Sequence, residues 1–268
     1  MIRRLCPGVA GLLVANSARA DWTLNMPRGV TELSAETYDL HMMVFYWCVA
    51  IAVVVFGAMI FTMIMHRKSR GVTPAKFTHS MSAEVTWTII PIIILLLMAI
   101  PAAETLIRIE DNRNPDLSIV VTGYQWRWHY DYQGEDVGFY SSIAVASNEA
   151  RRKQSGIDPR SVENYLLEVD NPLVVPRGAK VRLLLTSNDV IHAWWVPELS
   201  IKKDAIPGFM NEVWFQADES GVYRGQCAEL CGMDHAYMPV VVEVVEPAAF
   251  QSWIDSQRQA APAEPAPE

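Results

Sequence analysis

The sequence predicts a mixed membrane and all-β protein, in which a two-helix transmembrane hairpin precedes a Greek-key β-sandwich domain. Two long apolar runs lie before Glu104, and the rest of the chain contains short β-branched segments separated by turn residues. The 268 residues are 51% hydrophobic, yet the mean hydropathy is only +0.11. These values argue against a wholly soluble domain and against a bundle of many membrane helices, and the length suits one or two domains.

The amino terminus has the features of an export signal. Arg3 and Arg4 precede a short apolar stretch, and the segment 18–20 (Ala-Arg-Ala) has the small-x-small form of a cleavage site. We therefore predict a signal peptide over residues 1–20, cleaved so that Asp21 begins the mature chain. An irregular start of the mature chain is the alternative, because two glycines and a proline interrupt the apolar stretch.

Residues 21–104 are predicted to form an N-terminal segment and the hairpin. The apolar runs at 42–65 and 85–103 are long enough to cross the membrane, which takes about 20 residues in a helix. The basic sequence at 66–70 marks the cytoplasmic side. The rest of the chain is thus expected on the periplasmic side of a bacterial inner membrane.

Glu84 stands immediately before the second apolar run. A carboxylate beside hydrocarbon costs free energy unless it lies at the interface or has a partner. A helix dipole, however, favours an acidic residue in the first turn. From the residues alone, a helix-start role is preferred over a role in admitting protons to a membrane partner.

Residues 105–259 are predicted to form the sandwich, because short alternating or β-branched segments follow one another without a helical period. The predicted strands are residues 117–124, 164–169, 180–185, 193–196, 212–217, 221–226 and 239–245. Residues 147–161 are polar and are predicted to be an inserted loop or short helix. The tail at 260–268 is rich in Ala, Pro and Glu and is expected to be disordered.

Charge divides the chain in the same way as hydropathy. The net charge is −8, and acidic residues outnumber basic ones from Glu104 onward, whereas the earlier part is net positive. An acidic outer domain repels nucleic acid and suits a basic protein partner.

The most informative segment is G-Q-C-A-E-L-C-G-M-D-H-A-Y-M-P, which contains Cys227, Cys231, His235 and Met238. Thiolate, imidazole and thioether are soft ligands, which favour copper over magnesium, calcium or manganese. His192 follows an earlier predicted strand, and a neighbouring loop could bring it to the same place.

Two thiolates can bridge a pair of copper ions, each of which then keeps one histidine and one weak ligand. The residues of this arrangement are the bridging Cys227 and Cys231, the terminal His192 and His235, and the weak ligands Met238 and the carbonyl of Glu229. Three alternatives remain open from the residues alone: a disulfide, a Cys2His2 zinc site, or buried cysteines that act as hydrophobic side chains. Met238 weighs against zinc.

A second distinctive run is G-Y-Q-W-R-W-H-Y-D-Y, at residues 123–132. Alternation along a strand would place Trp126, Trp128 and Tyr130 on one face and the residues between them on the other. From this pattern alone, a packed sheet face is the preferred interpretation.

With these motifs, the chain from the hairpin to Trp253 resembles subunit II of haem-copper cytochrome c oxidases, which has a binuclear copper A centre. The resemblance implies a cupredoxin-like sandwich and a copper A ligand set. That set is His192, Cys227, Glu229 through its carbonyl, Cys231, His235 and Met238. The resemblance further implies that the Glu229 side chain and Asp204 contribute to a magnesium or manganese site at the border with the catalytic subunit.

The resemblance also assigns partner-facing residues. It implies that Trp126 is the electron entry point, and that Asp131, Asp170 and Asp189 dock a basic cytochrome c by a steering effect that salt weakens. Glu84 matches the glutamate that opens a proton pathway in the family, and the basic loop places it on the side where protons are taken up. This changes the preference for Glu84 to the proton-entry role.

The expected function is that of an electron-transfer subunit. It would accept electrons from cytochrome c and pass them to haem in catalytic subunit I, with subunit III as a further partner, for oxygen reduction coupled to proton pumping. The chain alone is not expected to reduce oxygen, because its predicted spans show no pair of haem-ligating residues, and it also has no C-x-x-C-H sequence for a fused c-type haem. The alternatives are a quinol oxidase subunit, which would lack the copper ligands, a periplasmic copper carrier, and a structural anchor with a disulfide.

Overall fold

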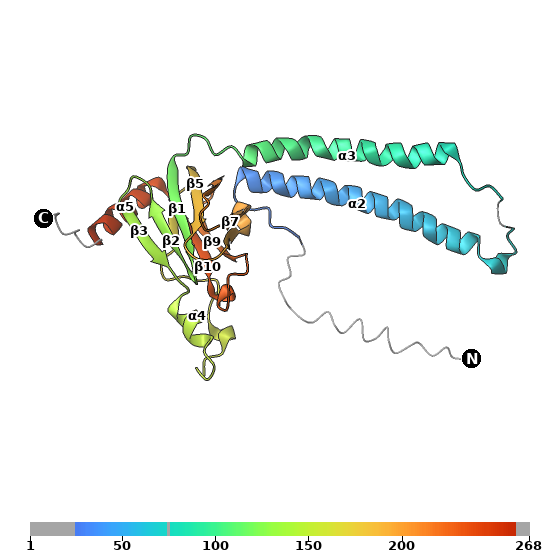
Figure 1. Cartoon of the computed structure of the whole chain (residues 1–268). Helices are drawn as coiled ribbons and strands as arrows, with labels where there is room; N and C mark the ends of the chain where they lie inside the picture. The colour runs from blue at the N-terminus through green and yellow to red at the C-terminus, as the bar shows by residue number, and fades with distance from the viewer. Residues whose placement is uncertain (1–24, 74–75, 261–268) are drawn as a thin grey trace.

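The computed structural model describes residues 25–73 and 76–260, which form a helical hairpin joined to a sandwich of two sheets (Figure 1). The predicted signal peptide at 1–20 lies outside the described residues. The helices are α2 (Glu32–Met65), α3 (Met81–Ile109), α4 (Val145–Ala150) and α5 (Pro247–Ala260), with short 3-10 helices η2 (Lys68–Arg70), η3 (Pro159–Ser161), η4 (Pro197–Leu199) and η5 (His235–Tyr237). The strands are β1 (Leu117–Tyr124), β2 (Arg127–Tyr132), β3 (Val137–Ser141), β4 (Leu173–Pro176), β5 (Lys180–Ser187), β6 (His192–Val196), β7 (Ile201–Ala205), β8 (Asn211–Gln216), β9 (Gly221–Cys227) and β10 (Pro239–Val245).

The two long helices contain the predicted spans: α2 begins before its span and ends with it at Met65, whereas α3 extends beyond its span at both ends. Helix α2 has 34 residues and α3 has 29, and both are long and apolar enough to cross a membrane. Helix α2 begins with a capping box, in which the Thr31 hydroxyl accepts from the Ser34 N–H at 2.9 Å and the Ser34 hydroxyl accepts from the Thr31 N–H at 3.0 Å. The apolar stretch of each helix is unburied within the single chain, as expected for surfaces that meet lipid or other subunits.

The hairpin is tied to the sandwich by polar contacts at the ends of the two helices. Arg108, near the end of α3, pairs with Glu32 at 2.8 Å and with Glu36, both in the first turns of α2. The Trp214 indole N–H, from β8, donates to the Arg108 carbonyl at 3.2 Å. The same arginine therefore joins both helices to the edge of a sheet.

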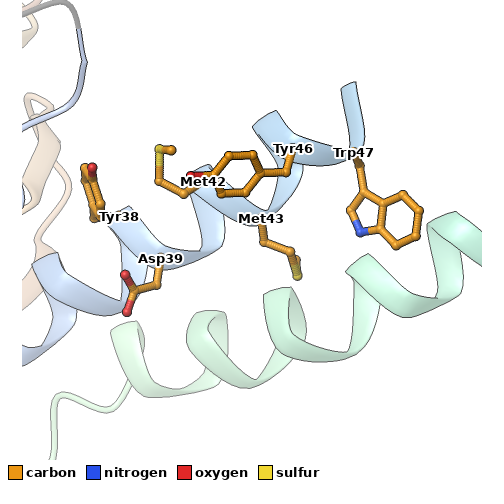
Figure 2. Close-up of a pocket in the computed structure, with 6 residues that line it drawn as sticks. All are labelled: Tyr38, Asp39, Met42, Met43, Tyr46 and Trp47. Carbon is orange, nitrogen blue, oxygen red and sulfur yellow. The ribbon is translucent and has the colours of Figure 1, made fainter. Parts of the chain in front are cut away.

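Six residues on one stretch of α2 line a hollow beside the hairpin: Tyr38, Asp39, Met42, Met43, Tyr46 and Trp47 (Figure 2). One helix supplies the whole lining, and in Figure 2 Asp39 and Met43 lie on its side that faces α3. The hollow is therefore part of the hairpin surface and is separate from the predicted metal ligands.

The sandwich has one five-stranded sheet in the order β3-β2-β1-β5-β8 and another in the order β4-β10-β9-β6-β7. Most neighbours are antiparallel, as predicted, but β1 pairs with β5 and β4 pairs with β10 in parallel. Parallel neighbours cannot be joined by a tight hairpin. In both pairs the chain passes through other strands before it returns beside its partner, as Greek-key connections do.

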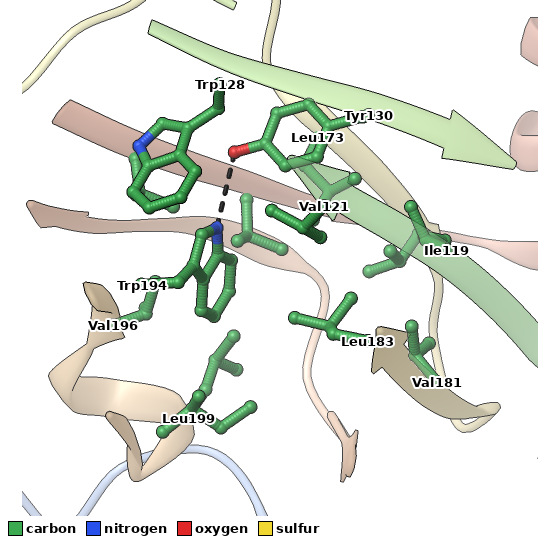
Figure 3. Close-up of a cluster of buried hydrophobic side chains, with 14 of the residues drawn as sticks. Ile119, Val121, Trp128, Tyr130, Leu173, Val181, Leu183, Trp194, Val196 and Leu199 are labelled. Atoms are coloured by element: carbon green, nitrogen blue, oxygen red, sulfur yellow. Dashed lines mark hydrogen bonds between the residues drawn. The ribbon is translucent and has the colours of Figure 1, made fainter. Parts of the chain in front are cut away.

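The core lies between the sheets and follows from the period-two pattern of the strands. Alternate residues of β1 and β5 are buried, and their side chains meet those of the opposite sheet. Figure 3 shows Trp128, Tyr130 and Trp194 in this core, with the Trp194 indole N–H donating to the Tyr130 hydroxyl at 3.3 Å. This hydrogen bond pairs the polar groups of Trp194 and Tyr130 in the core, whereas the buried indole N–H of Trp128 has no partner among the described residues.

One predicted strand is wrong. Residues 164–166 lie in a turn, and Asn164 and Leu166 have positive φ angles of 48° and 65°, which a strand does not allow. Only Val169 makes a β-bridge, to Ile143.

Several elements were absent from the predicted set. Strands β3, β4 and β7 have four or five residues each, too few to show a clear alternation. Helix α5 was also missed. It places Phe250, Trp253 and Ile254 against the sandwich, and the Trp253 and Tyr132 ring centres are 5.3 Å apart. Ala260, assigned to the tail, ends this helix, whereas 261–268 lie outside the described residues.

Candidate metal centre

Strand register brings the first histidine and the first cysteine together. His192 begins β6 and Cys227 ends β9, and the register of these strands pairs Trp194 with Cys227. Residues two apart on a strand share a face, so His192 and Trp194 point the same way. The His192 imidazole therefore lies diagonally opposite the Cys227 sulfur on the inner face of the sheet.

The remaining residues of the cluster lie on the connection between β9 and β10. The Cys227 N–H donates to the Met238 carbonyl at 3.0 Å, so the chain leaves and re-enters the sheet at neighbouring points. Cys231 lies four residues after the end of β9, and His235 begins η5. We call residues 227–238 the ligand loop.

The sulfur and nitrogen atoms converge within the ligand loop and β6. The two Sγ atoms are 3.8 Å apart, Cys227 Sγ is 3.9 Å from His192 Nδ1, and Cys231 Sγ is 3.5 Å from His235 Nδ1. Cys227 Sγ is also 3.4 Å from the Glu229 carbonyl oxygen. A disulfide would bring the sulfurs to about 2.05 Å, so both cysteines are free thiols here.

The centre is shielded from solvent. His192, Cys227, Cys231 and Met238 are all buried, whereas His235 is half-buried. The ligand atoms of His192 and both cysteines lie within 4.8 Å of one another, which is compact enough to hold metal.

The two sulfurs differ in their readiness to ionise. Burial opposes ionisation of Cys227, but hydrogen bonds with His192, the backbone and His235 outweigh it and lower its pKa to about 7. Burial and the adjacent Cys227 charge raise the pKa of Cys231 to about 12. Two thiolates at this spacing need a positive charge between them. The chemistry of the donor set therefore fits a cation of soft preference.

Asp189 orients His192. Its carboxylate accepts from His192 Nε2 at 2.9 Å, which leaves Nδ1 facing the sulfurs. Burial lowers the pKa of His192, but hydrogen bonds with Cys227 and Asp189 outweigh it and raise the pKa overall. Burial raises the pKa of Asp189, but its bonds to His192 and to backbone N–H groups lower it overall. One of these donors is the Gln125 N–H, at 2.7 Å.

Trp126 contacts the ligand loop directly. Its indole N–H donates to the Cys231 carbonyl at 3.2 Å, and the Gln125 side-chain amide donates to the same oxygen at 2.7 Å. Trp126 lies in the turn between β1 and β2, so its predicted place on a strand beside Trp128 and Tyr130 is wrong. Those two residues are fully buried, whereas Trp126 is half-buried.

Two glycines that the sequence interpretation did not single out permit this packing. A Cβ on Gly123 of β1 would lie 2.8 Å from the His192 ring, and a Cβ on Gly225 of β9 would lie 1.8 Å from the Trp195 carbonyl oxygen. Glycine inside a strand often marks a close approach of this kind. That signal was present in both segments.

The other predicted site residues lie outside the cluster. Asp204 is exposed on β7 opposite Ala193, Glu229 is exposed in the ligand loop, and Asp131 is half-buried on β2. The exposed Asp170 carboxylate accepts from the Ser142 and Asn171 N–H groups, each at 2.7 Å.

Glu84 is in the first turn of α3, at the far end of the hairpin from the sandwich (Figure 1). Its carboxylate is 3.9 Å from His79 Nδ1. The structure thus brings the two cysteines, the two histidines and the Glu229 carbonyl close together and keeps Glu84 well apart from them.

Two family models match the chain: cytochrome c oxidase subunit II, transmembrane domain, over residues 19–104, and its periplasmic domain, over residues 117–245. The chain is 37% identical over 240 residues to a probable cytochrome c oxidase subunit 2 of Rickettsia bellii, which covers 90% of this chain and 86% of the relative. The chain belongs to the cytochrome c oxidase subunit 2 family. Cytochrome c oxidase subunit 2 of Cereibacter sphaeroides is 32% identical over 271 residues, covering 94% of this chain and 89% of the relative.

Solved structures include a part of such a subunit. The periplasmic domain of subunit II of cytochrome oxidase from Bradyrhizobium japonicum is 42% identical, covers 55% of this chain and 96% of that domain, and gives a TM-score of 0.47.

Membership of the subunit 2 family confirms the predicted architecture and location. The chain is an inner-membrane subunit of a haem-copper oxidase complex, an oxidoreductase, with its β-sandwich on the periplasmic side. An electron-transfer role fits this family, and the cysteine and histidine cluster is compatible with copper.

Replacement of Gly123 by Ala should disturb the centre without unfolding the sandwich. The added methyl would press on the His192 ring, so we expect lower copper content and an altered visible spectrum in the purified chain. Gly138→Ala is the matched control, because its Cβ would meet its nearest neighbour at an ordinary 3.5 Å. Equal copper content and spectra in both variants would show that the His192 position does not depend on Gly123.

Proposed function

We propose that this subunit receives single electrons from cytochrome c at a binuclear copper A centre. It passes them to haem in catalytic subunit I, where oxygen is reduced to water with proton pumping. The observation that carries the proposal is a pair of buried free thiols 3.8 Å apart, each with a histidine nitrogen within hydrogen-bonding distance of sulfur. When bound, a thiolate-bridged copper pair would supply a carrier for one electron at a time.

Each proposed ligand has a place in the geometry. Cys227 and Cys231 would bridge, and His192 and His235 would each hold one side. The Glu229 carbonyl, 3.4 Å from the Cys227 sulfur, is positioned as one weak ligand. The other is the buried Met238, whose backbone is bonded to Cys227. In this arrangement, every cysteine, histidine and methionine of the ligand loop except Met233 is a proposed copper ligand.

The surroundings of the centre favour rapid electron transfer because they limit movement. Pairing of β9 with β6 fixes the backbone of Cys227, and Asp189 fixes the His192 ring. Burial keeps water away from the sulfurs. A site that changes little in shape between its two oxidation states has little to reorganise at each transfer.

Electron entry is proposed at Trp126. The indole is half-buried, and one hydrogen bond joins it to the backbone of Cys231, a proposed ligand. Asp131, Asp170 and Asp189 are proposed to attract the basic cytochrome. Internal hydrogen bonds occupy the last two carboxylates but leave their negative charge in place.

Two further partner contacts belong to the proposal. Asp204 is exposed on β7, which pairs with β6, and the Glu229 side chain is exposed on the ligand loop. Both are proposed to bind a magnesium or manganese ion at the border with subunit I. Glu84 is proposed to admit protons on the cytoplasmic side, and subunit III is a further expected neighbour.

The direct test of the proposed function is metal analysis of the purified full-length chain. We expect two copper ions for each chain, a purple colour and a multi-line paramagnetic spectrum from one electron shared by two ions. Zinc or a disulfide would leave the protein colourless. Fully folded protein that takes up no copper would refute the proposal.

Trp126→Phe should slow electron entry while leaving the centre intact. Phenylalanine keeps an aromatic ring at this position but lacks the indole N–H that bonds the Cys231 carbonyl. We therefore expect normal copper content and much slower reduction by cytochrome c in a stopped-flow experiment. Trp195→Phe is the matched control, a partly exposed indole on β6 that lies outside the proposed route. Unchanged reduction in Trp126→Phe would remove this residue from the route.

Glu84→Gln in the assembled oxidase should slow turnover without slowing reduction of the copper centre. The amide keeps the size of the side chain but cannot carry a proton. Glu104→Gln is the matched control, because Glu104 lies on the same helix near its opposite end. The readouts are oxygen consumption and stopped-flow reduction. Equal turnover in the two variants would assign Glu84 a helix-start role only.

A further inference from the structure

An ion pair between Arg151 and Asp234 joins the inserted segment to the ligand loop. Neither residue belongs to the proposed ligand set. Arg151 follows α4, and its guanidinium donates to both carboxylate oxygens of Asp234, with Nη1–Oδ1 at 2.9 Å and Nη2–Oδ2 at 3.2 Å. The two side chains are only 25% and 23% exposed. A bidentate, largely buried pair has a fixed geometry, unlike most surface ion pairs.

The guanidinium is held on its other sides as well. Its Nε donates to the Asn148 side chain at 2.7 Å, and its centre lies 4.2 Å from the centre of the Tyr237 ring. An arginine over an aromatic face gains a cation–π attraction. Asp234 and Tyr237 flank His235, so Arg151 grips the ligand loop on both sides of that histidine.

The platform that carries Arg151 is itself anchored to the sandwich. In α4, Ser147 and Ala150 are buried, and the Ser147 hydroxyl accepts from the Leu166 N–H at 3.2 Å. Just before the helix, the Ala144 N–H donates to the Glu168 carbonyl at 2.9 Å. The inserted segment therefore offers a fixed support rather than a free loop.

The ligand loop needs such a support near His235. Asp234 is the residue before η5, but its carboxylate does not cap that helix. It accepts hydrogen bonds from Arg151 instead. Within the loop, His235 is held by a backbone bond to Gly232 at 3.3 Å, and the neighbouring Met233 is 86% exposed. Packing against the core thus fixes His192, whereas His235 depends on contacts from outside the sheet.

We propose that Arg151 is a positioning residue for the metal centre: through Asp234 and Tyr237 it keeps His235 against Cys231 and so slows the release of copper. The inference rests on the proposed copper centre and adds to it a residue from the inserted segment. Arg151 does not contact the sulfur or imidazole atoms, so it acts through its neighbours.

The experiment compares copper release from the full-length chain in detergent. Wild type, Arg151→Gln, Arg151→Lys and Arg152→Gln are loaded with copper and mixed with an excess of chelator, and the visible absorption is followed. Arg152 is the matched control: it is the adjacent arginine, exposed, with no side-chain partner in the described part of the chain. The thermal midpoint of each metal-free chain is measured in parallel.

We expect Arg151→Gln to release copper about tenfold faster than wild type, the lower end of the range for residues that support metal ligands. Arg152→Gln should match wild type. Arg151→Lys keeps the charge but not the paired geometry, and should fall between them. The metal-free midpoints should be similar, because the ion pair fixes the loop and not the core. If Arg151→Gln does not fold, the same comparison of Arg151→Lys with Arg152→Gln decides the matter.

Three results would overturn the inference. Wild-type release in the Arg151 variants would show that the pair does not hold His235, and equal acceleration in Arg152→Gln would indicate a general charge effect. Faster release that only accompanies a large fall in the metal-free midpoint would indicate a purely structural role. A wild-type chain that loads no copper would instead refute the proposed function, and the inference with it.

Discussion

The proposed function of the protein depends on two cysteine sulfurs that lie 3.8 Å apart in a buried site. With the pKa of Cys227 lowered to about 7 and that of Cys231 raised to about 12, the first thiol ionises far more readily than the second, whose ionisation the neighbouring charge opposes. A soft cation removes this conflict, because both thiolates can then share its charge. The Cys227 N–H donates to the Met238 carbonyl, so the pairing of β9 with β10 brings the two ends of the ligand loop together. The fold therefore supplies the geometry in advance, and the metal supplies the missing charge.

Each of the two histidines has a different means of support. Asp189 bonds His192 directly and also accepts the Gln125 N–H, so one carboxylate fixes both a proposed ligand and the turn that carries Trp126. The support of His235 is indirect, because Arg151 holds Asp234 beside it. The His192 side of the centre is thus connected to the core and to the proposed electron entry point, whereas the His235 side is supported by the inserted segment. A substitution of Asp189 would change the proposed docking charge, the orientation of His192 and the turn that carries Trp126 at once, so it would not isolate the proposed docking role.

The sequence was most informative where chemistry and spacing coincide. The cluster of Cys227, Cys231, His235 and Met238 defined the centre because soft ligands rarely occur so close together without metal, and the apolar runs defined the hairpin by length. Strands β4 and β7 were missed since a strand of four or five residues has almost no period to detect. The segment 164–169 was mistaken for a strand because its β-branched and apolar residues pack through turns against the sandwich. The bonds of Asp189 and Arg151 join residues far apart in sequence or depend on loop geometry, and no local pattern encodes them.

The hairpin separates the proposed entry points for electrons and for protons. Helix α3 has 29 residues, which corresponds to about 44 Å at 1.5 Å per residue. Glu84 is in its first turn, and Arg108, in its last, is bonded to the sandwich through Trp214. Helix α3 therefore holds Glu84, the proposed proton-entry residue, at the opposite end of the hairpin from the proposed metal centre. Under the proposed function, electron arrival and proton uptake are separated by the length of α3, and the catalytic subunit would couple them. The subunit would then fix where each charge enters, while the partner determines how the two movements are linked.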